Sequence, residues 1–134
     1  MKIEIFTLCD AATEDHGKLN LLGSFDHLWA RQEPITHAAC TLAIKMRFTK
    51  IEEGSHKVRV TFVDEDGKQL LNALDVIASV IVGPGESTAT SHIVLNMQQL
   101  KLPRFGEYSI DLAVDGREEG SLPLYVRKVA DSQG

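Results

Sequence analysis

Apolar and polar residues alternate one by one along much of this chain, and this alternation constrains the fold more than any other feature. The clearest case runs from His37 to Phe48, where every even position is apolar: Ala38, Cys40, Leu42, Ile44, Met46 and Phe48. A period of two is that of a β-strand, whose successive side chains point to opposite faces. We therefore predict a strand with one buried face and one face in water, as antiparallel sheets allow.

Three other segments repeat this pattern and predict further strands: Lys57–Val63, Ser87–Met97 and Tyr108–Val114. Asp115-Gly116 follows the last of them and is a strong signal for a tight hairpin turn, with Gly116 as the turn glycine. The return strand would have Leu122, Leu124 and Val126 on its inner face. Pro123 cannot donate to a neighbouring strand, so we expect this last strand at a sheet edge.

The segment Lys68–Ile77 is the best helical candidate, because four apolar residues could share one helical face: Leu70, Leu71, Leu74 and Ile77. A short strand that leads into the apolar run 76–82 competes with this helix. The sequence favours the strand and leaves the helix open.

The N-terminal stretch predicts two strands, Lys2–Asp10 and Lys18–Ala30, joined by a polar loop that ends at Gly17. Gly23 interrupts the second strand, where we expect a bulge or bend. The stretch also brings Cys9, Asp10 and Asp26 together with the chain's one tryptophan. These residue types make the stretch the main candidate region for a metal or catalytic site.

The whole pattern predicts an all-β fold, an immunoglobulin-like antiparallel β-sandwich of two sheets and about seven to nine strands. The 134 residues suit one domain, which we place at 1–129, followed by a flexible tail at 130–134. Gly106 and Tyr108 open the penultimate strand with the spacing of a tyrosine corner. A tyrosine that simply packs in the core is the alternative.

Charge and composition exclude several classes of function. The net charge of −5 argues against a nucleic-acid partner, which a basic face usually binds. Glu4 breaks the N-terminal apolar run, so we expect no signal peptide. No stretch approaches the ~20 apolar residues of a membrane helix, so we expect no membrane contact. Together these features predict a cytoplasmic location. In that compartment Cys9 and Cys40 would be reduced.

The spacing of the candidate ligands gives little support for a metal site. Neighbours in a regular strand point to opposite faces, so Cys9 with Asp10, or Asp26 with His27, could not ligate one ion. Ligands from different strands remain an alternative, namely a metal-dependent hydrolase that uses Asp10, Asp26 and a histidine. We expect no catalytic residue, no metal and no cofactor, with the two carboxylates in hydrogen bonds near strand ends.

Trp29 has two interpretations. The pattern favours a core or near-core position, and the alternative is a partly exposed anchor for a partner, because tryptophan is enriched at binding hot spots. Arg31 is close enough in sequence to stack on it. If there is a partner-binding site, we expect Trp29, Arg31 and Asp26 in it. A carbohydrate-binding site would need Trp29 or Tyr125 exposed beside polar groups.

Several motifs together resemble a family of small bacterial proteins of unknown function. They are "CD" at Cys9-Asp10, "GKLNLLGSFDHLWA", "AIKMRF", "VTFVDEDGK" and "FGEYSIDLAVDG…SLPLYV". The resemblance covers nearly the whole chain and implies a bacterial source and a compact β domain. It implies no activity, so no catalytic residue follows from it.

We therefore predict a non-enzymatic interaction module. Its partner would be another protein, or a second copy of the chain that pairs through an edge strand.

Overall fold

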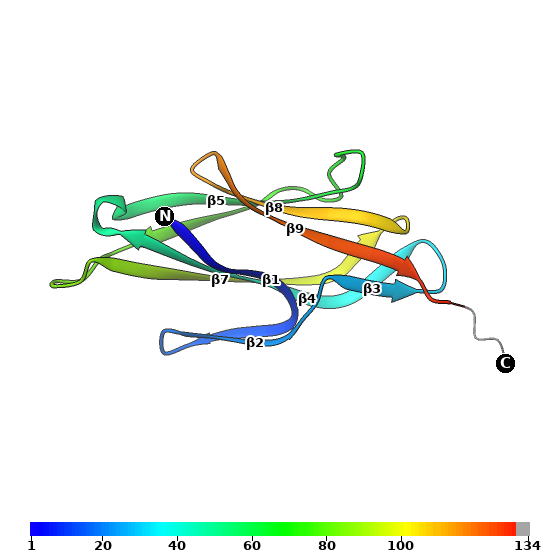
Figure 1. The fold of residues 1–134 in the computed structure, drawn as a ribbon, viewed down its shortest axis with the longest axis horizontal. Coiled ribbons are helices and arrows are strands. Elements are labelled where there is room, and N and C mark those ends of the chain that lie inside the picture. The colour runs from blue at the N-terminus through cyan, green and yellow to red at the C-terminus, as the bar shows by residue number, and fades with distance from the viewer. Residues whose placement is uncertain (131–134) are drawn as a thin grey trace.

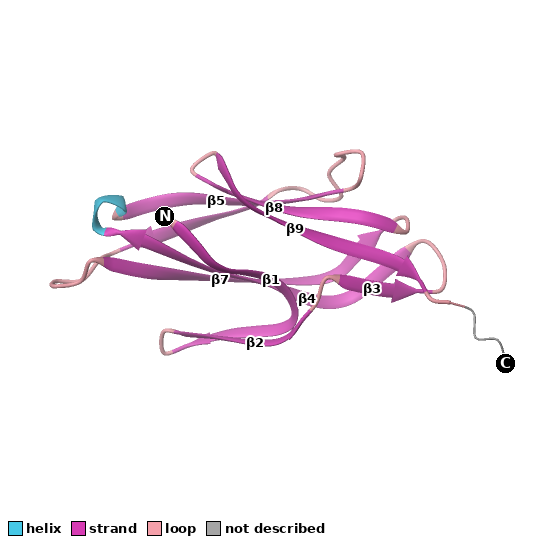
Figure 2. Ribbon diagram, in the orientation of Figure 1, coloured by secondary structure: helices cyan, strands magenta, loops and turns pink. Residues whose placement is uncertain are grey.

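The computed structural model describes residues 1–130, which form two packed β-sheets (Figures 1 and 2). Sheet A has the order β2-β1-β4-β7 and consists of β1 (Lys2–Asp15), β2 (Lys18–Ser24), β4 (Ile35–Thr49) and β7 (Thr88–Leu102). Sheet B has the order β3-β9-β8-β5-β6 and consists of β3 (His27–Ala30), β5 (Gly54–Val63), β6 (Leu74–Val80), β8 (Gly106–Val114) and β9 (Arg117–Lys128). A short 3₁₀ turn, η1 (Lys50–Glu52), links β4 to β5. Apart from Ala130, the tail predicted at 130–134 lies outside the described residues.

The strand order is that of an immunoglobulin-like sandwich. Strands β1, β4 and β7 take the places of strands A, B and E, while β5, β8 and β9 take those of C, F and G. The prediction of the fold class is confirmed. One pair departs from the purely antiparallel arrangement that we expected, because β3 runs parallel to β9.

The core lies between the sheets and consists of the alternating apolar residues. Phe48, Phe62, Leu112 and Leu124 are almost completely buried in it. Burying a side chain of this size contributes about 1.5–3 kcal/mol. Val58, Val60 and Phe62 point inward from β5, as the alternation predicts.

The face of β4 that points away from sheet B is more buried than we expected. Thr41 and Ala43 alternate with core residues, so they point away from sheet B, yet both are buried. The reason is the β1–β2 hairpin, which lies against this side of sheet A and reaches β7, where Glu14 approaches His92 at 3.8 Å (Figure 1). The prediction of one fully wet face was wrong because alternation along β4 does not reveal what packs on that face.

The segment Lys18–Ala30 is two strands, not one. The chain leaves sheet A after Ser24 and enters sheet B at His27, so β2 and β3 belong to different sheets. The predicted polar loop is a two-residue turn at His16-Gly17, where both residues have positive φ. Gly23 also has a positive φ of 68°, and a Cβ there would overlap the Asp10 carboxylate.

The predictions for residues 68–77 and for β9 were wrong in part. Strand β6 begins only at Leu74, and residues 68–73 form an irregular loop with a single bridge from Gln69 to Val63. Strand β9 is not a free edge throughout, because β3 pairs with residues 125–128. Pro123 lies beyond this short pairing, in the part of β9 that has only β8 as a neighbour.

Tyr108 adopts the arrangement of a tyrosine corner. Its buried hydroxyl donates a hydrogen bond of 2.6 Å to the Arg104 carbonyl and accepts one of 3.1 Å from the Arg104 amide. Gly106 precedes it with a φ of 145°, where a Cβ would come within 2.6 Å of Glu65 Oε1. At the other end of β8, Asp115 and Gly116 both have positive φ and form the predicted turn into β9.

Candidate functional site

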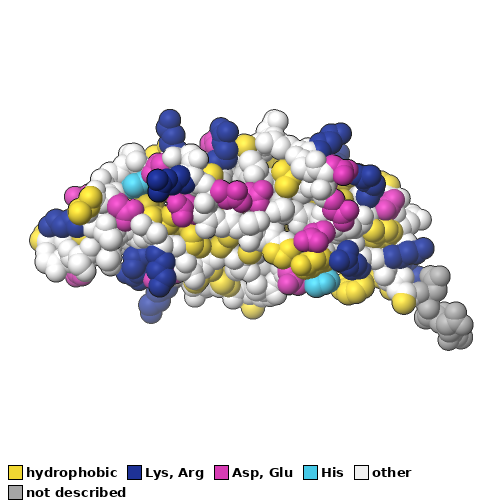
Figure 3. Space-filling model, turned by 45° about the horizontal axis from the view of Figure 1, so that its top comes forward, with side chains coloured by type: hydrophobic (Ala, Val, Ile, Leu, Met, Phe, Trp, Pro, Cys, Tyr) yellow, Lys and Arg dark blue, Asp and Glu magenta, His cyan; other side chains and the backbone are white. Residues whose placement is uncertain are grey.

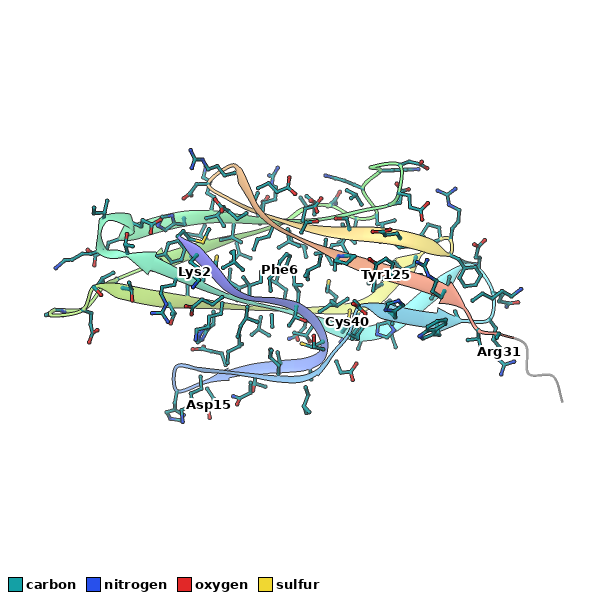
Figure 4. All side chains as sticks on the ribbon, viewed as in Figure 1. Lys2, Phe6, Asp15, Arg31, Cys40 and Tyr125 are labelled. Carbon is teal, nitrogen blue, oxygen red and sulfur yellow. The ribbon has the colours of Figure 1, made fainter. Side chains whose placement is uncertain are left out.

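Four side chains, two of them exposed and two half-buried, form a continuous surface at the β3 side of sheet B. They are His27 and Trp29 on β3 and Tyr125 and Arg127 on β9, and we call this set the aromatic face. Figure 4 shows Tyr125 on β9, far from Asp15 at the tip of the β1–β2 hairpin. Trp29 is 63% exposed, which is high for so large an apolar side chain.

The parallel pairing of β3 with β9 builds this face. His27 lies opposite Tyr125, and Trp29 lies opposite Arg127. The intervening residues Leu28 and Ala30 pack against the core, so the polar and aromatic residues must point outward. The interpretation of Trp29 as a core residue was therefore wrong, because the core-facing positions of β3 are those of Leu28 and Ala30.

The rings and charges of the face contact one another. The His27 ring stacks on Tyr125 with centroids 4.8 Å apart and lies nearly parallel to Trp29, with centroids 6.0 Å apart. The Arg127 guanidinium lies 5.1 Å from the centroid of the Tyr125 ring, within reach of a cation–π interaction. His27 Nδ1 donates to Asp26 Oδ1 at 2.6 Å, which fixes the ring orientation.

The structure brings two of the three predicted partner-binding residues together. Asp26 and Trp29 both lie at the aromatic face, joined through His27. The predicted split of Asp26 and His27 across a strand does not occur, because Asp26 precedes the start of β3. Arg31 is exposed beyond the end of β3 (Figure 4), and the cation that contacts a ring of the aromatic face is that of Arg127.

Sequence reasoning missed His27 and Arg127 as members of this surface. Arg127 follows Tyr125 by two residues, so a shared face of one strand could have been inferred. The pairing of β3 with β9 could not, because nearly a hundred residues of sequence separate the two strands and nothing local specifies a parallel partner.

The residues needed by a metal-dependent hydrolase do not converge. Within residues 1–130, no group of three or more His, Cys, Asp or Glu side chains has an arrangement that could hold a metal ion. Asp26 is engaged with His27, and Asp10 lies against Gly23. The geometry gives this alternative no support.

The two cysteines are buried and unpaired. Burial raises the pKa of the Cys40 thiol to about 11 and also raises the pKa of Cys9, whose Sγ donates to the Thr41 carbonyl. Both thiols are therefore protonated and unreactive near neutral pH.

A hollow with a volume of about 680 Å³ lies where β4 begins and β7 ends. Its charged lining residues are Asp64, Lys68, Lys101 and Arg104. The Asp64 carboxylate is already occupied, since it accepts hydrogen bonds from the amides of Asp66 and Lys68. The lining thus offers no free acid–base pair and no nucleophile beside a base.

Charges of both signs are interspersed over the face of the molecule that Figure 3 shows. This face therefore has no large patch of a single charge sign. The helical part of residues 1–130 is too short to span a membrane.

Comparisons with known proteins identify a family without an assigned activity. The sequence model of DUF6941, a family of unknown function, matches residues 4–127. No curated protein matches the chain.

Solved structures also resemble it, among them two proteins from Pseudomonas. One is the alkylpurine DNA glycosylase AlkC from Pseudomonas fluorescens, with 12% identity and a TM-score of 0.48. The match covers 94% of this chain and 30% of the glycosylase. The other is an immunoglobulin-like protein from Pseudomonas aeruginosa, with 14% identity and a TM-score of 0.36. This match covers 94% of this chain and 95% of that protein.

Proposed function

Since the chain belongs to this family, DUF6941, whose members have no known function, we propose a role from the surface of the protein itself. The protein is a non-enzymatic module that binds another protein through the aromatic face. The observation that supports this role is Trp29, 63% exposed on a paired strand and flanked by His27 and Arg127.

The chemistry of the aromatic face is that of a binding hot spot. Tryptophan, tyrosine and arginine are the residue types most enriched among the few side chains that dominate binding energy. Leaving Trp29 in water forgoes the roughly 1.5–3 kcal/mol that burying a large apolar side chain gives, and a partner recovers it. Stacking of His27 on Tyr125 holds the rings in place before binding, so less side-chain entropy is lost on association.

We place the protein in the bacterial cytoplasm. The bacterial source is supported by the resemblance of the motifs to a family of small bacterial proteins. The compartment is supported by Cys9 and Cys40, which are both free, as thiols are in a reducing compartment.

The test compares three forms of the chain as bait: wild type, Trp29→Ala and Ile77→Ala. Ile77 is the matched control, because it is 60% exposed on β6 at the opposite edge of the same sheet. We expect a partner captured by wild type and Ile77→Ala to be lost with Trp29→Ala, and its affinity, measured with purified components, to fall at least about tenfold. A partner retained at full affinity by Trp29→Ala would contradict the proposal.

A carbohydrate ligand is the second candidate, favoured by one observation. Exposed Trp29 has polar groups beside it, Asp26 and the His27 ring, as a stacking platform for sugars requires. The adjoining pocket, which includes Asp26, has a volume of about 260 Å³, below the usual range of about 300–1,000 Å³ for small-molecule sites. Oligosaccharides that perturb Trp29 fluorescence saturably would favour this candidate over a protein partner.

A further inference from the structure

One edge of the sandwich lacks the features that normally protect sheet edges. Strand β7 pairs with β4 on one side only, so one row of its amides and carbonyls has no strand partner. Such a row is a template for another strand unless charges, prolines, bulges or short length prevent pairing. The other three edges are short: β2 and β6 have seven residues each and β3 has four.

The sequence of β7 makes this edge unusual. Between Glu86 and Lys101 there is no Asp, Glu, Lys, Arg or Pro, although a quarter of the chain is charged. Strands β2 and β6, in contrast, carry Lys18 and Asp75. Gln99 has a positive φ of 54° and interrupts the ladder, so the regular pairable segment is 88–98.

An apolar groove of about 340 Å³ runs beside the same edge. Leu95 and Met97 of β7 form one wall, and Leu71 and Leu74, next to and within β6, form part of the other. These side chains are only half-buried, so a strand added to β7 would cover them.

We propose that the occupant is a second copy of this chain, whose β7 pairs antiparallel with the first about a twofold axis perpendicular to sheet A. Directly opposite residues of an antiparallel pair lie on the same face. In a pairing of 88–98 with itself, Ala89 and Ser91 of the second copy would lie opposite Met97 and Leu95 of the first, on the side that faces Leu71 and Leu74. The outer side of the pair would bring together the uncharged polar residues and Val94 of β7, with Glu14 of the β1–β2 hairpin beside His92.

The match of the strand with itself argues for a second copy over an unrelated strand. The chain has a net charge of −5, so two copies repel each other wherever their acidic surfaces meet. Strand β7 itself has no formally charged residue over eleven consecutive positions, 88–98, and the acidic side chain beside it, Glu14, lies against His92. The residues of the second strand that would lie beside the apolar groove, Ala89, Ser91 and Ile93, are small or apolar and carry no charge.

The pairing would leave the aromatic face free. Strand β3 is at the opposite edge of the sandwich from β6 and β7, so the two copies would present two aromatic faces. A partner with two binding sites would then bind more tightly through linked contacts. The inference does not depend on the function proposed for the aromatic face.

The test is the mass of the protein in solution by analytical ultracentrifugation across a wide range of concentration. We expect a concentration-dependent dimer for wild type, and a rise of at least about tenfold in its dissociation constant for Met97→Lys, which would bury a charge under the second copy. The double variant T90K/Q98K changes two exposed outer positions and serves if Met97→Lys folds poorly. Leu22→Lys, 72% exposed on the β2 edge, is the control and should leave the dimer intact.

Hydrogen exchange of the backbone amides identifies which strand edge forms the dimer contact. Amides of β7 that have no partner in β4 should exchange more slowly as the dimer forms. A monomer at every concentration would overturn the proposal. A dimer that survives both β7 variants would also overturn it, as would protection of β7 by a different protein while the chain alone stays monomeric.

Discussion

The ring of His27 stacks on Tyr125 at a centroid distance of 4.8 Å, and this contact joins β3 to β9 on the outer side of sheet B. Trp29, two residues after His27, projects from the same side into solvent. The neighbouring Leu28 points the other way, into the core. Trp29 and Leu28 therefore allow the exposed side and the core side of β3 to be tested separately.

We expect Trp29→Ala to change the free energy of unfolding by at most about 0.5 kcal/mol, as is usual for exposed positions. Leu28→Ala should cost about 2 kcal/mol, because it removes a side chain packed on the core. Urea denaturation of both variants measures the difference. A loss for Trp29→Ala as large as that for Leu28→Ala would mean that the tryptophan packs in the native protein.

Removing one oxygen atom from the tyrosine corner should destabilise the domain. Tyr108→Phe leaves the Arg104 carbonyl and amide without the hydroxyl that they both contact, and we expect a loss of about 1–2 kcal/mol. Tyr125→Phe is the matched control, since no hydrogen bond of its hydroxyl is present in residues 1–130. Equal stability of the two variants in thermal unfolding would refute a structural role for the Tyr108 hydroxyl.

Gly23 and Gly17 separate two costs of adding a methyl group. Both have positive φ, but Gly17 faces open space whereas a Cβ at Gly23 would overlap the Asp10 side chain. Gly17→Ala should therefore show only the backbone cost of about 1 kcal/mol, and Gly23→Ala should cost more. Combining Gly23→Ala with Asp10→Ala should recover the excess, which a double-mutant cycle measures; no recovery would mean that the carboxylate is not the obstacle.

His56 makes stability depend on pH near neutrality. The Asp115 carboxylate accepts from Nδ1 and the Glu52 carbonyl accepts from Nε2, so both ring nitrogens need a proton and the pKa of His56 is raised. A raised pKa in the folded state gives a stabilising contribution that is complete below the ordinary value of about 6.5 and is lost as pH rises through the folded pKa. The pKa of Asp115 is lowered by His56, so this carboxylate stays ionised throughout that window.

The variant His56→Gln should therefore lose more stability relative to wild type at about pH 5.5 than at about pH 8.5. His16→Gln is the control, because the contact of His16 with Asp15 is exposed to solvent, and its effect on stability should be the smaller at both pH values. Urea midpoints at the two pH values measure the difference. A deficit for His56→Gln that grows with pH would show that the sign is wrong.

The sequence predicted those parts of the fold that local alternation determines. Val58, Val60 and Phe62 point inward as their spacing requires, and Asp115-Gly116 forms the turn that its residue types favour. The burial of Thr41 and Ala43 was not predictable in this way. It follows from the β1–β2 hairpin, which lies on the outer side of sheet A and reaches His92 of β7, and alternation along one strand does not reveal such packing.

For the candidate site, the sequence predicted individual residues but not their arrangement in space. Trp29 and Asp26 were singled out because of their residue types, yet their neighbours depend on where the chain crosses from one sheet to the other. That crossing, between Ser24 and His27, looks like the middle of a single apolar strand in the sequence. The parallel pairing with β9 then brings Arg127 to Trp29, and it is a long-range contact that no local pattern specifies.

Iodide quenching of the chain's one tryptophan tests the aromatic face most directly, because the fluorescence of Trp29 reports on that surface alone. We expect strong quenching in the free protein, close to that of the unfolded chain, and clear protection when a partner captured by wild-type bait is bound. A tryptophan already shielded in the free protein, or one that stays equally accessible in the complex, would contradict the account.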